Sequence, residues 1–153
     1  MRVKIFSSCF SLQYSVCRIA DVFLFFSSST LNSMEKFVFE NLEVWIQAVD
    51  FADIVLSLSE RVFDKKHFRL AEQLEAACTS VSMNIAEGAG RNSVKERIQF
   101  LHYSRGSLNE TITLITILRK RTWISTEEYQ VIYNKASSIS RMLYAYIRHL
   151  RQN

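Results

Sequence analysis

The chain has 153 residues, 48% of them apolar, which suits one domain with a single hydrophobic core. Its net charge is +4, but residues 34–153 hold 16 basic and 14 acidic residues and so carry only +2. That balance is too small to argue nucleic-acid binding from charge alone. No pair of the three cysteines has metal-ligand spacing, and nothing in the sequence suggests a disulfide framework, so a reducing cytoplasm is the simplest compartment.

The first 33 residues differ in composition from the rest of the chain. They are rich in serine and aromatic residues and have no helical period. The apolar run at 22–26 follows Asp21, has no small-residue cleavage site after it, and is too short to span a bilayer. We therefore expect Met34 to be the natural start. Residues 1–33 would be a disordered or upstream-translated extension, and residues 34–153 the four-helix domain.

Two amphipathic helices are predicted next, at 41–63 and 68–87. The first has two parallel apolar stripes, which together exceed the arc of about 100° that a surface helix needs. The excess predicts a contact with another subunit. The stripes are Leu42, Trp45, Val49, Ala52 and Leu56, and Val44, Ala48, Phe51, Val55, Leu58 and Val62.

The segment 80–93 predicts a corner between the second and third helices. A residue that tolerates positive φ is needed just past a helix end, and Gly88 or Gly90 supplies it. Ser93 can cap the following helix, and Glu96, three residues later, predicts a capping box. Both ends of the corner are thus specified by the sequence.

Glu87 lies in the last predicted turn of its helix, where the helix dipole disfavours an acid. Ser80, Asn84 and Glu87 form a polar stripe, which fits two interpretations. It is either a solvated edge beside an ordinary turn, or Asn84 and Glu87 bond across to an arginine and fix the corner or an interface. The candidate arginines are Arg91, Arg97 and Arg105.

The third helix is predicted over 94–121. Its apolar stripe has Arg105 at a core-like position, with Glu110 as a possible partner. Gly106 costs about 1 kcal/mol in a helix interior unless a neighbour approaches closely. We therefore predict a tight helix crossing at Arg105, Gly106 and Ser107. The apolar members of the stripe are Val94, Ile98, Leu101, Leu108, Ile112 and Ile115.

Arg119, Lys120 and Arg121 end the third helix. They either complement the dipole at its C-terminus or form a phosphate-binding cluster. Ser125 and Glu128 then predict a second capping box at the start of the fourth helix. Heptad spacing continues to the end of the chain through Tyr129, Ile132, Ala136, Ile139, Leu143, Tyr146 and Leu150.

Four helices of about 20–28 residues joined by short turns predict an all-α, antiparallel up-down-up-down four-helix bundle. The paired Glu-x-x-His motifs of a di-metal bundle enzyme are absent from the sequence, as are a catalytic triad and a phosphate loop. We therefore predict no catalytic residues, no metal and no cofactor. Cys78 lies among small apolar residues and is predicted to be a buried thiol rather than a nucleophile.

Three motifs carry a resemblance to a known family: Phe-Glu-Asn-Leu-Glu-Val-Trp at 39–45, Asn-Ile-Ala-Glu-Gly at 84–88 and Gly-Ser-Leu-Asn-Glu at 106–110. Through them the chain resembles the bacterial four-helix bundle family associated with 23S rRNA intervening sequences. That family is similar to the accessory variability protein of diversity-generating retroelements. The resemblance implies a cytoplasmic, non-catalytic homo-oligomer, a pentameric barrel, with no membrane association. The retroelement relatives assemble with a reverse transcriptase and bind nucleic acid through a basic surface.

Two functions follow as hypotheses. The first is an RNA- or ribonucleoprotein-binding accessory protein, in which assembly multiplies a modest charge into a ring of cations. Its candidate contacts are Arg91, Lys95, Arg97, Arg119, Lys120, Arg121, Arg141 and Arg148. The alternative is a protein-interaction or structural module without nucleic-acid binding. The wide apolar face of the first helix suits it, as do Tyr103, Tyr129, Tyr133, Tyr144 and Tyr146, unless these are only core or subunit contacts.

Overall fold

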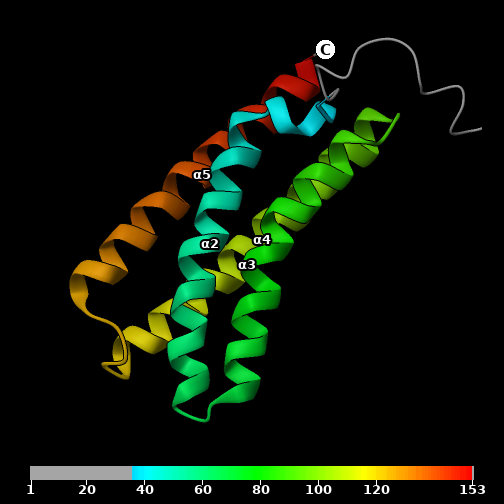
Figure 1. Ribbon diagram of the computed structural model, residues 1–153. Coiled ribbons are helices and arrows are strands. Elements are labelled where there is room, and N and C mark those ends of the chain that lie inside the picture. The colour runs from blue at the N-terminus through cyan, green and yellow to red at the C-terminus, as the bar shows by residue number, and fades with distance from the viewer. Residues whose placement is uncertain (1–35, 153) are drawn as a thin grey trace, which may run out of the picture. The chain divides into compact units, whose positions relative to one another are not determined.

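The computed structural model describes residues 36–152 (Figure 1). Its elements are a short 3-10 helix, η1 (Val38–Asn41), and the four α-helices α2 (Glu43–Asp64), α3 (Phe68–Ala89), α4 (Val94–Lys120) and α5 (Thr126–Gln152). No strand occurs between residues 36 and 152, and the all-α prediction is confirmed. The expectations for residues 1–33 and for a start at Met34 lie outside the described residues.

The helices are arranged as a ring in which each packs against two others. Helix α2 packs against α3 and α5, and α4 packs against the same two helices, whereas α2 and α4 lie diagonally opposite each other, as do α3 and α5. Figure 1 shows that successive helices run in opposite directions. The α3–α4 turn therefore shares one end of the bundle with the start of α2 and the end of α5. We call this end the corner end.

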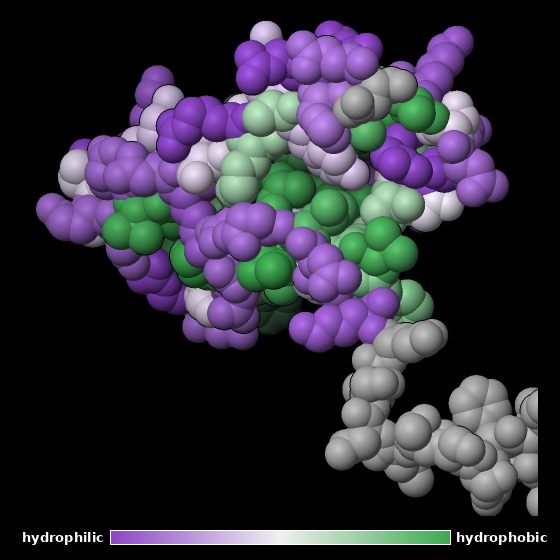
Figure 2. Space-filling model, turned by 90° about the horizontal axis from the view of Figure 1, so that it is seen from above, coloured by the Kyte–Doolittle hydropathy of each residue, from purple (hydrophilic) through white to green (hydrophobic). Residues whose placement is uncertain are grey.

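The core is built from heptad-spaced apolar side chains. All six members of one predicted α2 stripe are buried, from Val44 to Val62. The other stripe is less uniformly buried, because Ala52 is buried whereas Val49 is 39% exposed. In α5, Ile132, Ala136, Ile139, Leu143 and Leu150 are buried, as the heptads predict. Viewed from the corner end, hydrophobic side chains remain visible between hydrophilic ones (Figure 2). The bundle is therefore well filled, but its apolar surface is not fully covered.

The stripe predicted for α4 is partly wrong. Arg105 is half-buried rather than in the core, and Val94 is 44% exposed. Two polar residues, Ser104 and Thr111, are instead completely buried beside Leu108. Each hydroxyl donates to a backbone carbonyl, so burial leaves it satisfied. A hydrophobicity pattern does not register such residues, which is why it placed the core face of α4 too far around the helix.

The turns use positive φ at residues that the sequence did not indicate. Gly88 and Gly90 were expected to supply it, but no described glycine has positive φ: α3 continues to Ala89, and Gly90 has φ −79°. Lys66 (φ 64°) and Thr122 (φ 57°) adopt the left-handed conformation in the α2–α3 and α4–α5 turns. Gly88 is needed for a different reason, close helix packing.

Only one of the two predicted capping boxes forms. The Ser125 backbone N–H donates to Glu128 Oε2 at 2.8 Å, and the Glu128 N–H donates to Ser125 Oγ at 3.1 Å. Ser93 has the backbone conformation of a cap but makes no side-chain cap bond. Because Ser93 and Glu96 are both exposed, solvent can satisfy the first N–H groups of α4 without them.

Cys78 is completely buried between α2 and α3. Its thiol donates to the carbonyl of Glu75 at 3.3 Å, and its Sγ lies 4.0 Å from the carbonyl oxygen of Ala52. Burial raises the pKa of the thiol to about 11, which confirms the prediction of a buried rather than nucleophilic cysteine.

Candidate nucleic-acid interface

Charge is divided between the two halves of the bundle. Helices α2 and α3 together hold eight acidic and two basic residues, a net charge of −6. Helices α4 and α5 together hold nine basic and four acidic residues, a net charge of +5. Because α4 and α5 are neighbours in the ring, the two helices of the positively charged half lie side by side. The small net charge of the chain therefore conceals a strongly asymmetric molecule.

Helix α5 contributes the most uniform basic surface. It carries no acid after Glu128, and its later basic residues are Lys135, Arg141, Arg148 and Arg151. Lys135 Nζ is bound to Asp50 of α2 at 3.2 Å. The three arginines are exposed, and Arg141 Nη1 donates to Ser137 Oγ one turn away at 3.0 Å. The predicted contacts Arg141 and Arg148 thus lie on one helix with their charges open to solvent.

Arg91 and Arg97 are held by the α3–α4 corner itself. Arg91 forms an ion pair with Glu87 within the chain, and its guanidinium carbon lies 4.8 Å from the centroid of the Phe100 ring. Arg97 Nη2 donates to the carbonyl of Arg91 at 3.0 Å. These bonds make both arginines structural parts of the turn, and the Nε atoms of both are buried without a hydrogen-bond partner. Lys95, the third predicted contact at the corner, is exposed.

The polar stripe on α3 faces α4. Asn84 Nδ2 donates to the carbonyl and hydroxyl oxygens of Ser80, at 2.7 and 2.9 Å, rather than to an arginine. Ser80 Oγ in turn lies 2.9 Å from Ser107 Oγ on α4. Ser104 Oγ donates to the carbonyl of Val81 at 2.9 Å inside the core. Ser80 and Asn84 thus form part of a hydrogen-bonded seam between α3 and α4, not a solvated edge. The arginine contact predicted for Glu87 does form, because Glu87 pairs with Arg91 at the corner, whereas the one predicted for Asn84 does not.

Gly88, not Gly106, marks the closest approach of these helices. A Cβ atom added at Gly88 would lie 3.0 Å from Phe100 Cβ and 3.3 Å from the carbonyl oxygen of Arg97. A Cβ added at Gly106 would meet nothing within 4 Å, so the tight crossing predicted there is wrong. Gly106 lies on the outer side of α4, whereas Ser107 faces the seam.

The pairing of Arg105 with Glu110 is also wrong. Glu110 Oε1 accepts a hydrogen bond from Gln73 Nε2 at 3.1 Å, across the α3–α4 seam. Arg105 has no hydrogen-bond or ion-pair partner among residues 36–152. It lies one heptad from Ile98 and from Ile112, which are half-buried against the core. Arg105 therefore places a positive charge without an acidic partner on the side of α4 that carries Ile98 and Ile112.

The basic run at the end of α4 lies far from the corner. Arg119 Nη2 donates to Thr126 Oγ1 at 2.7 Å, and the Arg121 guanidinium lies 5.6 Å from the Trp123 ring. Lys120 is exposed. With a rise of 1.5 Å per residue, Lys120 is about 37 Å along α4 from Lys95. The eight predicted contacts therefore form three groups, at the corner, along α5 and at the α4–α5 turn, rather than one patch.

The five tyrosines divide into two sets. Tyr129 and Tyr146 are half-buried against the core, as core contacts would be. Tyr103, Tyr133 and Tyr144 are 52%, 45% and 60% exposed. Tyr133 and Tyr144 lie on α5 with the arginines, an association that the sequence analysis missed. The signal was present in the sequence, because these tyrosines and the arginines lie in the part of α5 that has no acidic residue, after Glu128.

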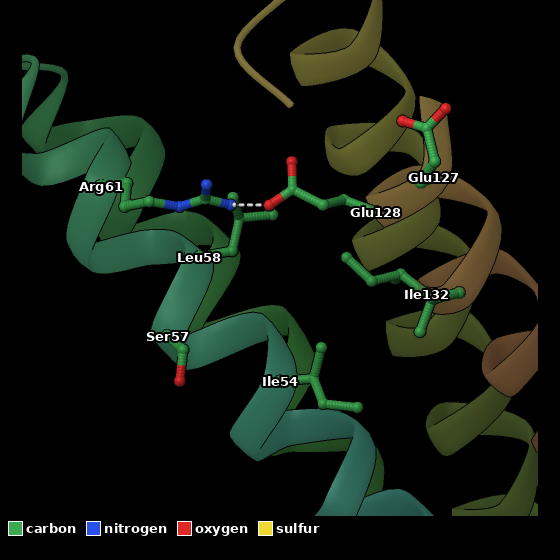
Figure 3. A pocket seen from close by; sticks show the side chains of 8 residues that line it. Ile54, Ser57, Leu58, Arg61, Glu127, Glu128 and Ile132 are labelled. Atoms are coloured by element: carbon green, nitrogen blue, oxygen red, sulfur yellow. Dashed lines mark hydrogen bonds and ion pairs between the residues drawn. The ribbon is translucent and has the colours of Figure 1, made fainter. Parts of the chain in front are cut away.

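Two surface cavities flank α5. The first, about 420 Å³, lies between α2 and α5 and has a mainly apolar lining. Figure 3 shows Arg61 of α2 reaching Glu128 of α5 across it, with Nη2 and Oε1 2.7 Å apart, while Glu127 points away. The second, about 470 Å³, lies between α4 and α5 and has a mixed lining that includes Tyr133 and Arg141. Only the second lies on the basic half.

The described residues show no metal site and no membrane span. Nowhere in residues 36–152 do three or more His, Cys, Asp or Glu side chains gather as metal ligands. In the same region, no helix combines the length and the apolar character that crossing a bilayer requires.

Comparison with known proteins identifies the family. The model of the 23S rRNA-intervening sequence protein family matches residues 40–145. The chain belongs to this family. A solved structure from Bacteroides thetaiotaomicron, described as a protein of unknown function from the S23 ribosomal protein family, is 27% identical with a TM-score of 0.65. The match covers 68% of this chain and 97% of that one. No curated protein matches the chain.

Proposed function

We propose that this member of the 23S rRNA-intervening sequence protein family is a cytoplasmic, non-catalytic, homo-oligomeric RNA-binding accessory protein. The separation of charge between the two halves of the bundle carries the proposal. A face that gathers cations binds phosphates and releases counterions, and these contributions add along the backbone. A net charge of +5 on α4 and α5 supplies such a face without requiring a basic chain overall.

Assembly would use the opposite half. On the outer side of α2 and α3, Val49 is 39% and Met83 66% exposed. The bonds of Ser59 with Glu75 and of Cys78 with Ala52 set the register of these antiparallel helices and bring Val49 level with Met83. This apolar surface, continued by half-buried Trp45, suits a second copy of the chain. In a closed ring of five, this surface would pack on a different surface of the next subunit, and the proposal requires that second surface to leave the exposed arginines of α5 free.

The decisive experiment compares two equal charge reversals in the full chain. Arg148→Glu on α5 and Arg69→Glu on α3 both alter an exposed arginine and both change the net charge by −2. We expect the first to weaken binding of a labelled RNA by about tenfold or more at low salt, because a lost phosphate contact is replaced by repulsion. The second should change the affinity by less than about twofold.

Two results would reject the proposal. If the wild-type protein does not bind RNA at low salt, the function is wrong. Equal losses in the two variants would show that only net charge matters and that the α4–α5 half has no special role. Light-scattering mass with nuclease treatment tests the assembly separately, since a monomer would contradict the pentamer.

A second function is favoured by the same apolar surface. Val49 and Met83 could contact a different protein, such as a reverse-transcriptase-like partner, instead of a second copy. The protein would then be an interaction module without nucleic-acid binding. A monomeric, RNA-free protein that forms a stable complex with such a partner, lost in Met83→Glu, would favour this function over the first.

A further inference from the structure

One face of α5 combines exposed aromatic and basic side chains in a single track. With 3.6 residues per turn, its members fall within an arc of about 100° and extend for about 27 Å. No acidic residue occurs in α5 beyond Glu128. Exposed tyrosines and arginines follow one another along the track. We call it the α5 stripe: Tyr133, Ser137, Arg141, Tyr144, Arg148 and Arg151.

The aromatic members of the stripe are positioned to offer their rings. Tyr133 is 45% exposed, and its ring is stacked on that of Tyr129, with centroids 5.6 Å apart and planes 29° apart. Tyr129 is half-buried against the core and therefore provides a fixed support. Because the Tyr133 ring is already held in place, it loses less conformational entropy when a base stacks on it. Tyr144 lies three turns further on and is 60% exposed.

Beside Tyr133 lies the cavity of about 470 Å³ between α4 and α5. Its floor is apolar, and its rim offers side-chain amide and hydroxyl groups together with the guanidinium of Arg141. Such a lining can take a flat apolar ring, hydrogen-bond its polar edge and neutralise a phosphate. The floor is formed by Leu108, Ile112 and Ala136, and the rim by Asn109, Thr113, Ser137 and Ser140.

We propose that the α5 stripe and the adjoining cavity bind single-stranded RNA, with unpaired bases stacked on Tyr133 and Tyr144 and phosphates held by Arg141 and Arg148. This inference rests on the proposed function and adds the form of RNA and the mode of binding. A duplex hides the faces of its bases, so exposed rings would not contribute to binding it. Stacking on aromatic side chains with cations alongside is the general means of holding single strands without regard to sequence.

The experiment measures binding of the full chain to a labelled 12-nucleotide oligouridylate and to a 12-base-pair RNA duplex. Tyr133→Leu should weaken single-strand binding by about 5- to 150-fold, the range expected for one lost stacking contact. Its affinity for the duplex should change by less than about twofold. Tyr133→Phe should keep the wild-type single-strand affinity, because stacking needs the ring and not the hydroxyl. Tyr103→Leu, at an exposed tyrosine on α4, is the matched control and should also bind normally.

The outcomes separate this inference from the function on which it rests. If the wild-type protein binds neither RNA, both are wrong. If it binds RNA but Tyr133→Leu behaves like Tyr103→Leu, or if duplex binding falls equally, the stripe is wrong while RNA binding stands. A lower oligomer mass for Tyr133→Leu with unchanged single-strand affinity would show that a second copy of the chain occupies this face, and would also overturn the inference.

Discussion

The α3–α4 and α2–α5 contacts hold the same bundle together in opposite ways. Between α3 and α4, small residues allow a close approach, and hydroxyls such as those of Ser80 and Ser104 bond across the seam. Between α2 and α5, exposed ion pairs, Arg61 with Glu128 and Lys135 with Asp50, bridge the helices beside an open cavity. The α3–α4 contact depends on shape and tolerates few substitutions. The α2–α5 contact depends on charge and cap geometry, so disrupting it should lower the free energy of unfolding by less.

The largest effect is expected at the α3–α4 seam. Gly88→Leu should lower the free energy of unfolding by about 3 kcal/mol, because its side chain would overlap Phe100 and the backbone of Arg97. Gly106→Leu, at an unobstructed helix position, should instead raise it by about 0.5–1 kcal/mol through helix propensity. Urea unfolding followed by circular dichroism measures both. Changes of the same sign in the two variants would contradict the assignment of Gly88 as the packing glycine.

A smaller effect is expected where α5 begins beside α2. Ser125→Ala removes the hydroxyl that accepts from the Glu128 N–H and should destabilise the protein by about 1 kcal/mol. Ser93→Ala is the matched control at the start of α4, where no cap bond exists, and should change stability by less than about 0.5 kcal/mol. Thermal unfolding of both variants is the measurement. A larger loss from Ser93→Ala would show that the wrong cap had been identified.

The smallest effect is a dependence of stability on pH. The pKa of Glu128 lies below its ordinary value of 4.5, because the Ser125 backbone N–H and then Arg61 stabilise its charged form. Since the folded-state pKa is the lower one, this stabilisation is complete above pH 4.5 and is lost as the pH falls through the folded-state value. The Tm of the wild-type protein should therefore fall more between pH 6 and pH 3 than that of Glu128→Gln.

The variant should keep part of the pH dependence. The pKa of Glu127 is also lowered, by its own backbone N–H and then by the Ser125 hydroxyl, and Glu127 remains in Glu128→Gln. Calorimetric scans of the two proteins at matched ionic strength make the comparison. Equal falls in Tm would mean that the bonds of Glu128 contribute nothing to folding.

The sequence predicted what depends on regular spacing and missed what depends on particular contacts. The heptads of α5 and the capping box of Ser125 were found because both follow from local spacing. The core face of α4 was misplaced because Ser104 and Thr111 are buried through bonds to their surroundings, which hydropathy does not record. Gly88 and Gly106 were given the wrong roles because a lone glycine does not reveal whether it serves a turn, a crossing or neither.

The same distinction applies to the candidate site. The asymmetry of charge can be counted from the sequence once each residue is assigned to a helix. Whether each basic side chain is bound within the protein or exposed to solvent cannot be read from the sequence. Arg91 and Arg97 are engaged by the corner, Arg119 by Thr126, whereas Arg148 is exposed on α5. These differences arise from the tertiary packing of α3, α4 and α5, not from local sequence.

The rate at which a reagent labels the buried thiol of Cys78 can measure how often the bundle opens. At pH 7, a thiol with a pKa of about 11 is ionised in only about one molecule in ten thousand, and in the closed bundle it is also shielded from reagents. Labelling of Cys78 therefore requires α2 and α3 to separate. Its rate would report how often this pair of helices opens under native conditions. The half of the molecule for which we propose the subunit contact thus contains this probe, and such a contact should slow the labelling.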